Sequence, residues 1–327
     1  MKGTTYIAFT LVFLVVLAGS VVRMTGSGMG CPDWPKCFGR LIPPTSEDQI
    51  TWAPDMLYNE GQMVIEDETL WKAKVQHTSS GDEFSPENWE KYTKHDYATF
   101  NSLHTWVEYI NRLLGALSGI PILLLFSLSL TSKKVVPIVL SSGTLLSVLF
   151  VSWLGKLVVD GNLIPFSVTI HAVSALAILA FLVGMMQHLS GERYIVTKTL
   201  RVLLIFALAF SFLQLVMGTQ VREQIDILLE NGISRTDLID TLPSWWKFHR
   251  TAVWPLILLH LLWAVPTMKI MGLRNFAFIV FAILLAQTLS GFLFVYLGMP
   301  AIVQPAHIML AFGLILVNLR VLLASKS

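Results

Sequence analysis

Long apolar runs alternate with shorter polar stretches along the chain, and this pattern gives the first prediction of its fold. A transmembrane helix needs about 20 consecutive, mostly apolar residues to cross the hydrocarbon core of a bilayer. Eight runs meet this requirement, at residues 4–23, 100–130, 135–157, 164–187, 200–220, 246–267, 275–297 and 303–323. We therefore predict an all-α membrane protein with eight transmembrane helices.

The first run also has features of a cleaved signal peptide. Lys2 precedes it, and the small residues Ala18–Ser20 lie near its end. Seven further apolar runs follow, and the sequence is 54% hydrophobic and only 13% charged, more apolar than a soluble domain of this length needs. We therefore favour a retained membrane helix.

Charged residues are unevenly distributed among the polar stretches. Residues 24–98 hold 13 Asp and Glu against 6 Lys and Arg, and residues 223–246 hold 5 against 1. Basic residues concentrate instead in the termini and in alternate short loops: Lys2, Lys133, Lys134, Arg193, Lys198, Arg201, Lys269, Arg274 and Lys326. Because basic loops stay on the cytoplasmic side, we predict a multi-pass protein of the cell membrane with both termini in the cytoplasm and the acidic segments outside.

The extracytoplasmic segment 24–98 contains a stretch, residues 47–95, that is too polar for the membrane and too long for a plain loop. The sequence from 61 to 75 predicts two short strands joined by a turn at Glu66–Glu68, within a small β-module at about 55–93. The module resembles the aromatic β-modules of chitin-binding domains, too weakly to infer sugar binding. We expect it to form a lid over the outer face.

Matching polar positions in the two halves of the chain indicate an internal repeat. The pairs are Gly19–Arg23 with Gly218–Arg222, Asn111–Arg112 with His249–Arg250, and His171 with His307. Each half has four apolar runs, so the two copies share their membrane orientation and the repeat is parallel. We predict two pseudo-symmetric four-helix bundles, residues 1–187 and 188–327, with the β-containing insert in the first.

His249 and His307 lie near the starts of the sixth and eighth runs, at comparable depth in the membrane. Two imidazoles facing each other within one bundle suit haem iron, whereas zinc would want four ligands. The alternative is that each histidine bonds only to backbone or hydroxyl groups. We favour haem, with Arg222 or Arg250 directed at the propionates and with Gly218 leaving room for a flat ring.

The first half offers an asymmetric version of this arrangement. His171 would face Glu108 and Asn111, which together with His104 follow the i, i+4, i+7 spacing of one helix face. One strong axial ligand beside a carboxylate is typical of a reactive or substrate haem site. We predict His171 as the iron ligand and Glu108 as a proton-handling group. The alternative is that Glu108 only pairs with His104 or Arg112 at the interface.

Three further residues after the first run are candidates for function. Arg23 lies at the hydrocarbon boundary and either anchors the helix or pairs with a ligand carboxylate. Cys31 and Cys37 are the two cysteines of the chain and lie on the predicted oxidising side. A structural disulfide is favoured, and a reactive thiol pair is the alternative.

Taken together, these motifs resemble the heme A synthase family of cytochrome oxidase assembly. The similarity is carried by Val22–Pro35, by Glu108–Arg112 and by the histidines at 171, 249 and 307. The resemblance implies a membrane oxidoreductase that oxidises a porphyrin methyl group of heme O to a formyl group, giving heme A. It also implies haem b between His249 and His307, a heme O site with Glu108 and His171, and a Cys31–Cys37 disulfide with a proposed redox role.

The sequence departs from the family pattern at two places. The family usually has histidine where this chain has Asn111, so the substrate iron has either His171 alone or a second ligand in His104. The insert at 47–95 is the second departure. Two other functions therefore stay open: a non-catalytic haem-binding assembly factor, and a b-type electron-transfer protein linked to quinol.

The resemblance also implies partners. We expect heme O as substrate, an electron donor, membrane lipid, and haem O synthase or cytochrome oxidase assembly proteins. We expect no nucleic-acid partner.

Overall fold

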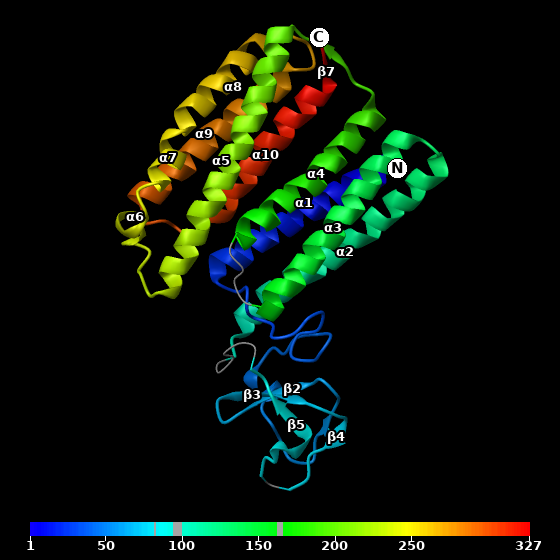
Figure 1. Ribbon diagram of the computed structural model, residues 1–327, viewed down its shortest axis with the longest axis vertical. Coiled ribbons are helices and arrows are strands. Elements are labelled where there is room, and N and C mark those ends of the chain that lie inside the picture. The colour runs from blue at the N-terminus through cyan, green and yellow to red at the C-terminus, as the bar shows by residue number, and fades with distance from the viewer. Residues whose placement is uncertain (82, 94–99, 162–165) are drawn as a thin grey trace. The chain divides into compact units, whose positions relative to one another are not determined.

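The computed structural model describes residues 1–327 except residues 82, 94–99 and 162–165 (Figure 1). Eight helical spans among the described residues are long and apolar enough to cross a membrane, which confirms the predicted number. The helices that form them are α1 (Lys2–Thr25), α2 (Ser102–Ser132), α3 (Val135–Gly161), α4 (Ser167–Ser190), α5 (Lys198–Glu230), α7 (Trp246–Thr251), α8 (Val253–Thr267), α9 (Arg274–Tyr296) and α10 (Val303–Ala324). The predicted start of the fourth run, at residue 164, lies outside the described residues.

The sixth span consists of two helices, α7 and α8, which are separated at Ala252. Pro255 lies four residues after Thr251 and has no N–H to donate to the Thr251 carbonyl, so a regular helix cannot run through this point. His249 is therefore carried by the short helix α7, and the rest of the span by α8. A short helix, α6 (Leu238–Thr241), precedes them.

The chain folds into two compact units, and the larger comprises residues 1–20, 115–151 and 166–327. Its interior holds two clusters of apolar side chains. One cluster draws on α1, α2, α4, α5 and α10, and the other on α5, α8, α9 and α10. Helices α5 and α10 therefore belong to both, and α4 packs against each of them. The predicted pseudo-symmetry between two bundles stays a prediction.

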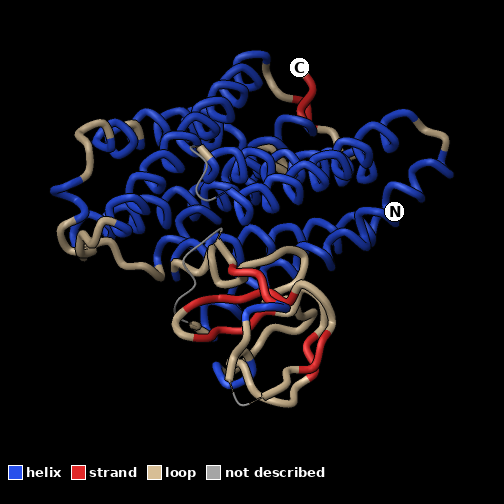
Figure 2. Tube along the Cα trace, turned by 60° about the horizontal axis from the view of Figure 1, so that its bottom comes forward, coloured by secondary structure: helices blue, strands red, loops and turns tan. Residues whose placement is uncertain are grey.

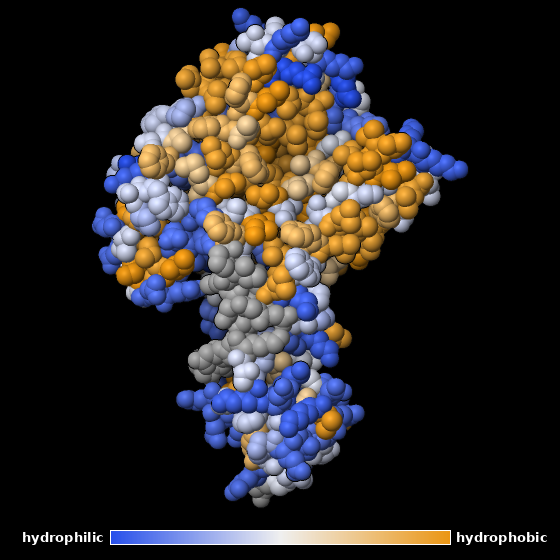
Figure 3. Space-filling model, viewed as in Figure 1, coloured by the Kyte–Doolittle hydropathy of each residue, from blue (hydrophilic) through white to orange (hydrophobic). Residues whose placement is uncertain are grey.

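Strands are few in the larger unit. Strand β6 (Tyr194–Ile195), between α4 and α5, pairs in parallel with β7 (Ser325–Lys326), which follows α10. Apolar side chains cover much of the visible face of the long helices, as expected for surfaces that meet lipid (Figure 3).

The smaller unit comprises residues 21–114 and 152–165 and contains the predicted β-module. In it, β2 (Met63–Glu66), β3 (Thr69–Ala73) and β5 (Trp89–Lys91) form a three-stranded sheet, and β1 (Leu57–Tyr58) pairs with β4 (His77–Thr78) (Figure 2). Asp67 and Glu68 join β2 to β3 with positive φ angles of 46° and 53°. The predicted hairpin and its turn are therefore confirmed.

The β-module has two small cores. Tyr58, Val64, Ala73 and Trp89 form one, with Trp71 and other aromatic rings packed around it. The second joins the strands to the loop that follows α1, since it contains Cys31, Cys37, Phe38, Ile50, Met63, Ile65 and Leu70. The insert and the cysteine loop thus share one hydrophobic core.

Candidate functional site

His249 on α7 and His307 on α10 face each other in the larger unit. Their ring centroids are 6.5 Å apart and their planes differ by 70°. The Phe294 ring lies 5.1 Å from that of His307. Helices whose histidines are 58 positions apart in the sequence thus bring two imidazoles together.

His307 is held by two polar side chains of α9. Its Nδ1 atom lies 2.6 Å from Ser290 Oγ, and its Nε2 atom lies 3.1 Å from Gln287 Nε2. The Ser290 hydroxyl in turn donates a hydrogen bond to the Gln287 carbonyl at 2.8 Å. Neither Ser290 nor Gln287 was predicted as a site residue. Their i, i+3 spacing, which places both side chains on one helix face, is the sequence signal that could have identified them.

His249 is packed differently. Its Nδ1 atom is buried and has no hydrogen-bond partner among the described residues. A methyl group added at Gly218 on α5 would lie 3.1 Å from His249 Cε1, so the absence of a side chain at 218 lets the imidazole approach the helix. At Gly291 an added methyl group would meet no atom within 4 Å.

The predicted propionate-binding arginines have protein partners. Arg222 donates to Gln304 Oε1 at 2.7 Å and forms an ion pair with Asp226 at 2.5 Å. Gln304 lies one turn before His307 on α10, so Arg222 is tied to the helix that carries this histidine. The Arg250 guanidinium lies 4.9 Å from the centre of the Trp246 ring, and Arg250 is exposed.

His260 on α8 is buried and bonded within the protein. Its Nδ1 atom lies 2.8 Å from the Leu256 carbonyl, and its Nε2 atom lies 2.8 Å from Asn318 Nδ2. Both ring nitrogens therefore have partners within the protein.

In the smaller unit, Glu108 is held at both carboxylate oxygens. Oε2 accepts the Cys31 N–H at 2.9 Å, and Oε1 pairs with Arg112, one turn further along α2. The side chains of Arg112 and Glu108 are 14% and 7% exposed, so the ion pair is nearly buried. Of the two pairings considered for Glu108, the one with Arg112 is observed.

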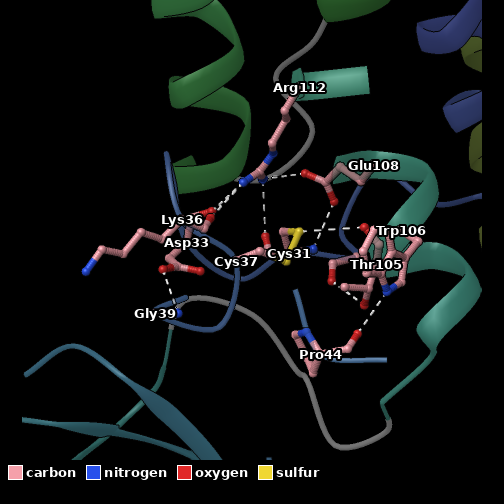
Figure 4. Close-up of a disulfide and its surroundings, with 11 residues drawn as sticks. Cys31, Asp33, Lys36, Cys37, Gly39, Pro44, Thr105, Trp106, Glu108 and Arg112 are labelled. Atoms are coloured by element: carbon pink, nitrogen blue, oxygen red, sulfur yellow. Dashed lines mark hydrogen bonds and ion pairs between the residues drawn. A yellow bond between two sulfur atoms is a disulfide. The ribbon is translucent and has the colours of Figure 1, made fainter. Parts of the chain in front are cut away.

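Arg112 also fastens the cysteine loop (Figure 4). Its Nη1 atom donates to the carbonyls of Asp33 at 2.6 Å and Lys36 at 3.0 Å, and its Nη2 atom donates to that of Cys31 at 3.4 Å. Cys31 and Cys37 are joined in a disulfide, as predicted, and are 1% and 0% exposed. The sequence analysis gave Arg112 no such role.

Asp33 closes the same loop by accepting the Gly39 N–H at 3.0 Å. Burial raises the pKa of this carboxyl above its ordinary value of 3.8, although hydrogen bonds from Gly39 and the nearby Arg112 charge act in the opposite direction. A side chain at Gly39, whose φ is 72°, would collide with the Gly61 backbone. The loop is therefore packed closely against the β-module.

The remaining candidates of the first half are less constrained. His171 on α4 places Nδ1 2.9 Å from the Ser167 carbonyl. Asn111 Oδ1 is buried without a hydrogen-bond partner among the described residues. The backbone N–H of His104 donates to Asn101 Oδ1 at 3.1 Å. Arg23 lies in the last turn of α1. A haem-binding role for these residues stays a prediction.

Comparison with known proteins gives two matches. The model of the COX15-CtaA family, described as cytochrome oxidase assembly protein, matches residues 3–74 and 60–319. A heme A synthase of Shewanella oneidensis is 34% identical over 83 residues, which are 25% of this chain and 24% of that protein. This alignment therefore spans about a quarter of the relative's length, while the family model extends over nearly the whole chain.

Proposed function

The chain belongs to the cytochrome oxidase assembly protein family, and from that premise we propose that it is a heme A synthase of the cell membrane. In this proposal it oxidises a porphyrin methyl group of heme O to a formyl group by hydroxylation-type chemistry. Both termini face the cytoplasm, in agreement with the distribution of basic loops. The similarity to the heme A synthase of Shewanella oneidensis supports this assignment.

The observation that carries the proposal is the pairing of His249 with His307. Their ring centroids lie 6.5 Å apart, close enough for both imidazoles to bind one iron. His249 and His307 would hold a haem b, which would supply one-electron redox chemistry when bound.

The surrounding donor set also favours haem. Among the residues that the structure describes, no group of three or more His, Cys, Asp or Glu side chains could hold a metal ion. The proposed donors are therefore the imidazoles of His249 and His307. Gly218 supports the fit because it allows His249 to lie close to α5. Arg222 on α5 donates to Gln304, which lies one turn before His307 on α10, and Arg222 is our candidate for binding a propionate. Arg250 and Arg23 are weaker candidates.

We assign the substrate chemistry to the first half of the chain. His171 is the proposed ligand of the heme O iron, and Glu108 the proposed proton-handling or orienting group. Because Asn111 is a poor iron ligand, His171 is the single protein ligand in this proposal. The partners that follow are heme O, an electron donor, and haem O synthase or oxidase assembly proteins.

A second function is favoured by one observation. Glu108 is engaged with Arg112 and the Cys31 N–H, as expected for a carboxylate that stabilises the outer loop. A haem-binding assembly factor without catalytic activity would need Glu108 only for this stabilising role.

Expression with a haem O synthase distinguishes these functions. Haems extracted from the purified wild type should include haem b and a formyl-bearing haem. His307→Ala should lose haem b, and Glu108→Gln should keep haem b and lose the formyl product. Haem binding without any formyl product in the wild type would favour the assembly factor, and no haem at all would refute both functions.

A further inference from the structure

The two facing imidazoles differ in how their second ring nitrogen is satisfied. His307 Nδ1 lies 2.6 Å from Ser290 Oγ, whereas His249 Nδ1 is buried with no partner among the described residues. A metal-bound histidine almost always donates its other N–H to a protein group, which fixes the tautomer and raises the basicity of the ligating nitrogen. The support for the two rings is therefore unequal.

The hydrogen bonds of Ser290 favour one tautomer of His307. A hydroxyl has one proton to donate, and the Gln287 carbonyl at 2.8 Å can only accept it. With the proton in that bond, the Ser290 oxygen accepts in its contact with His307, which favours the tautomer with the imidazole proton on Nδ1. Nε2 then carries the lone pair, toward which the Gln287 amide nitrogen is directed at 3.1 Å.

From this geometry we infer that Ser290 is a positioning residue: it holds His307 as the anchoring axial ligand with Nε2 available to iron, and leaves His249 as the weaker, exchangeable ligand. The inference rests on the proposed haem b site and extends it to residues of α9. Gln287 keeps the Nε2 lone pair hydrogen-bonded and must release it when iron binds.

Helix α9 offers a matched control for Ser290. Thr288 Oγ1 donates to the Leu284 carbonyl at 2.8 Å, so Thr288→Val also removes a hydroxyl bonded to the α9 backbone, but it leaves the two bonds of Ser290 in place. Ser290→Ala removes the acceptor of the His307 proton. Ser290→Thr keeps a hydroxyl at the same position.

The experiment titrates haem b into the purified full-length protein in detergent and follows the Soret band, and then measures the midpoint potential of the loaded protein. Loss of an outer hydrogen-bond partner of a metal-binding histidine typically weakens metal affinity by about 10- to 100-fold. We expect that loss for Ser290→Ala, with a higher midpoint potential because the less basic imidazole stabilises ferric iron less. Thr288→Val should match the wild type, and Ser290→Thr should restore most of the affinity.

Two outcomes would overturn the inference while leaving the proposed function standing: wild-type affinity and potential in Ser290→Ala, or equal weakening by Thr288→Val. A wild type that binds no haem b would instead refute the haem site itself. Exchangeability is tested with His249→Ala and His307→Ala. We expect added imidazole to restore a six-coordinate spectrum in His249→Ala, and His307→Ala to retain much less haem. Greater haem retention by His307→Ala than by His249→Ala would refute the proposed difference between the two ligands.

A measurement on the unsubstituted protein covers the case in which Ser290→Ala does not fold. The ¹⁵N shifts of the His307 ring in the haem-free protein report the tautomer directly. We expect a protonated Nδ1, and a protonated Nε2 would overturn the inference.

Discussion

Removal of the Arg112 side chain should expose the Cys31–Cys37 disulfide to reductants. The cysteines are 1% and 0% exposed, and Arg112 binds three backbone carbonyls of the loop that contains them as well as Glu108. Arg112→Leu would leave the Glu108 carboxylate nearly buried without its countercharge. We therefore expect the loop to open more often, with reduction proceeding through the open form.

The magnitude follows from the burial of the ion pair. Breaking a buried pair by removing one partner costs about 3–5 kcal/mol. If that cost falls on local opening of the loop, the opening equilibrium rises by roughly 100- to 4,000-fold, since each 1.4 kcal/mol is about tenfold. Reduction by a phosphine should accelerate by a similar factor. The rate is measured from the mass shift after quenching with an alkylating agent.

The control is a substitution within the same loop. We take Lys36 as that control because it is exposed, and such surface changes usually alter stability by about 0.5 kcal/mol or less, roughly twofold in rate. Adding Glu108→Gln to Arg112→Leu should slow reduction again, because the neutral amide still accepts the Cys31 N–H and leaves no unpaired charge. If the disulfide of Arg112→Leu is reduced no faster than that of Lys36→Leu, the ion pair does not hold the loop and the reasoning is refuted.

Three further predictions concern single positions. Gly218→Ala should weaken haem b binding, since its methyl group would lie 3.1 Å from His249 Cε1; an unchanged Soret titration would contradict this. Gly39→Ala should accelerate disulfide reduction, because φ is 72° and the new Cβ collides with the Gly61 backbone; a wild-type rate would show that the loop can shift at no cost. Burial raises the pKa of Asp33 in the folded loop, so the folded state binds this proton more tightly and Asp33 costs stability as pH rises above 3.8 toward the raised pKa. The disulfide of Asp33→Asn should therefore be reduced progressively more slowly, relative to that of the wild type, as pH rises through that window. A ratio of the two reduction rates that does not change with pH would contradict the raised pKa of Asp33.

Several features of the fold could be predicted from the sequence because their causes are local. The eight spans follow from run length and apolarity, which the bilayer thickness sets regardless of packing. The hairpin of β2 and β3 follows from its turn residues, Asp67 and Glu68. The disulfide followed from the predicted compartment and from the presence of only two cysteines. The break between α7 and α8 had its local signal in Pro255, which the hydropathy pattern did not reveal.

The contacts that organise the candidate site depended on tertiary structure. The similar depth of His249 and His307 in two spans predicted that they would face each other. It did not predict the unequal support of their Nδ1 atoms, because Ser290 reaches His307 from another helix. Arg112 binds the Asp33 carbonyl across 79 residues of sequence. Apolarity and turn propensity belong to a segment itself and can be read along the chain. The partner of a buried hydrogen-bonding group depends on which distant segment packs beside it, and only the folded chain decides that.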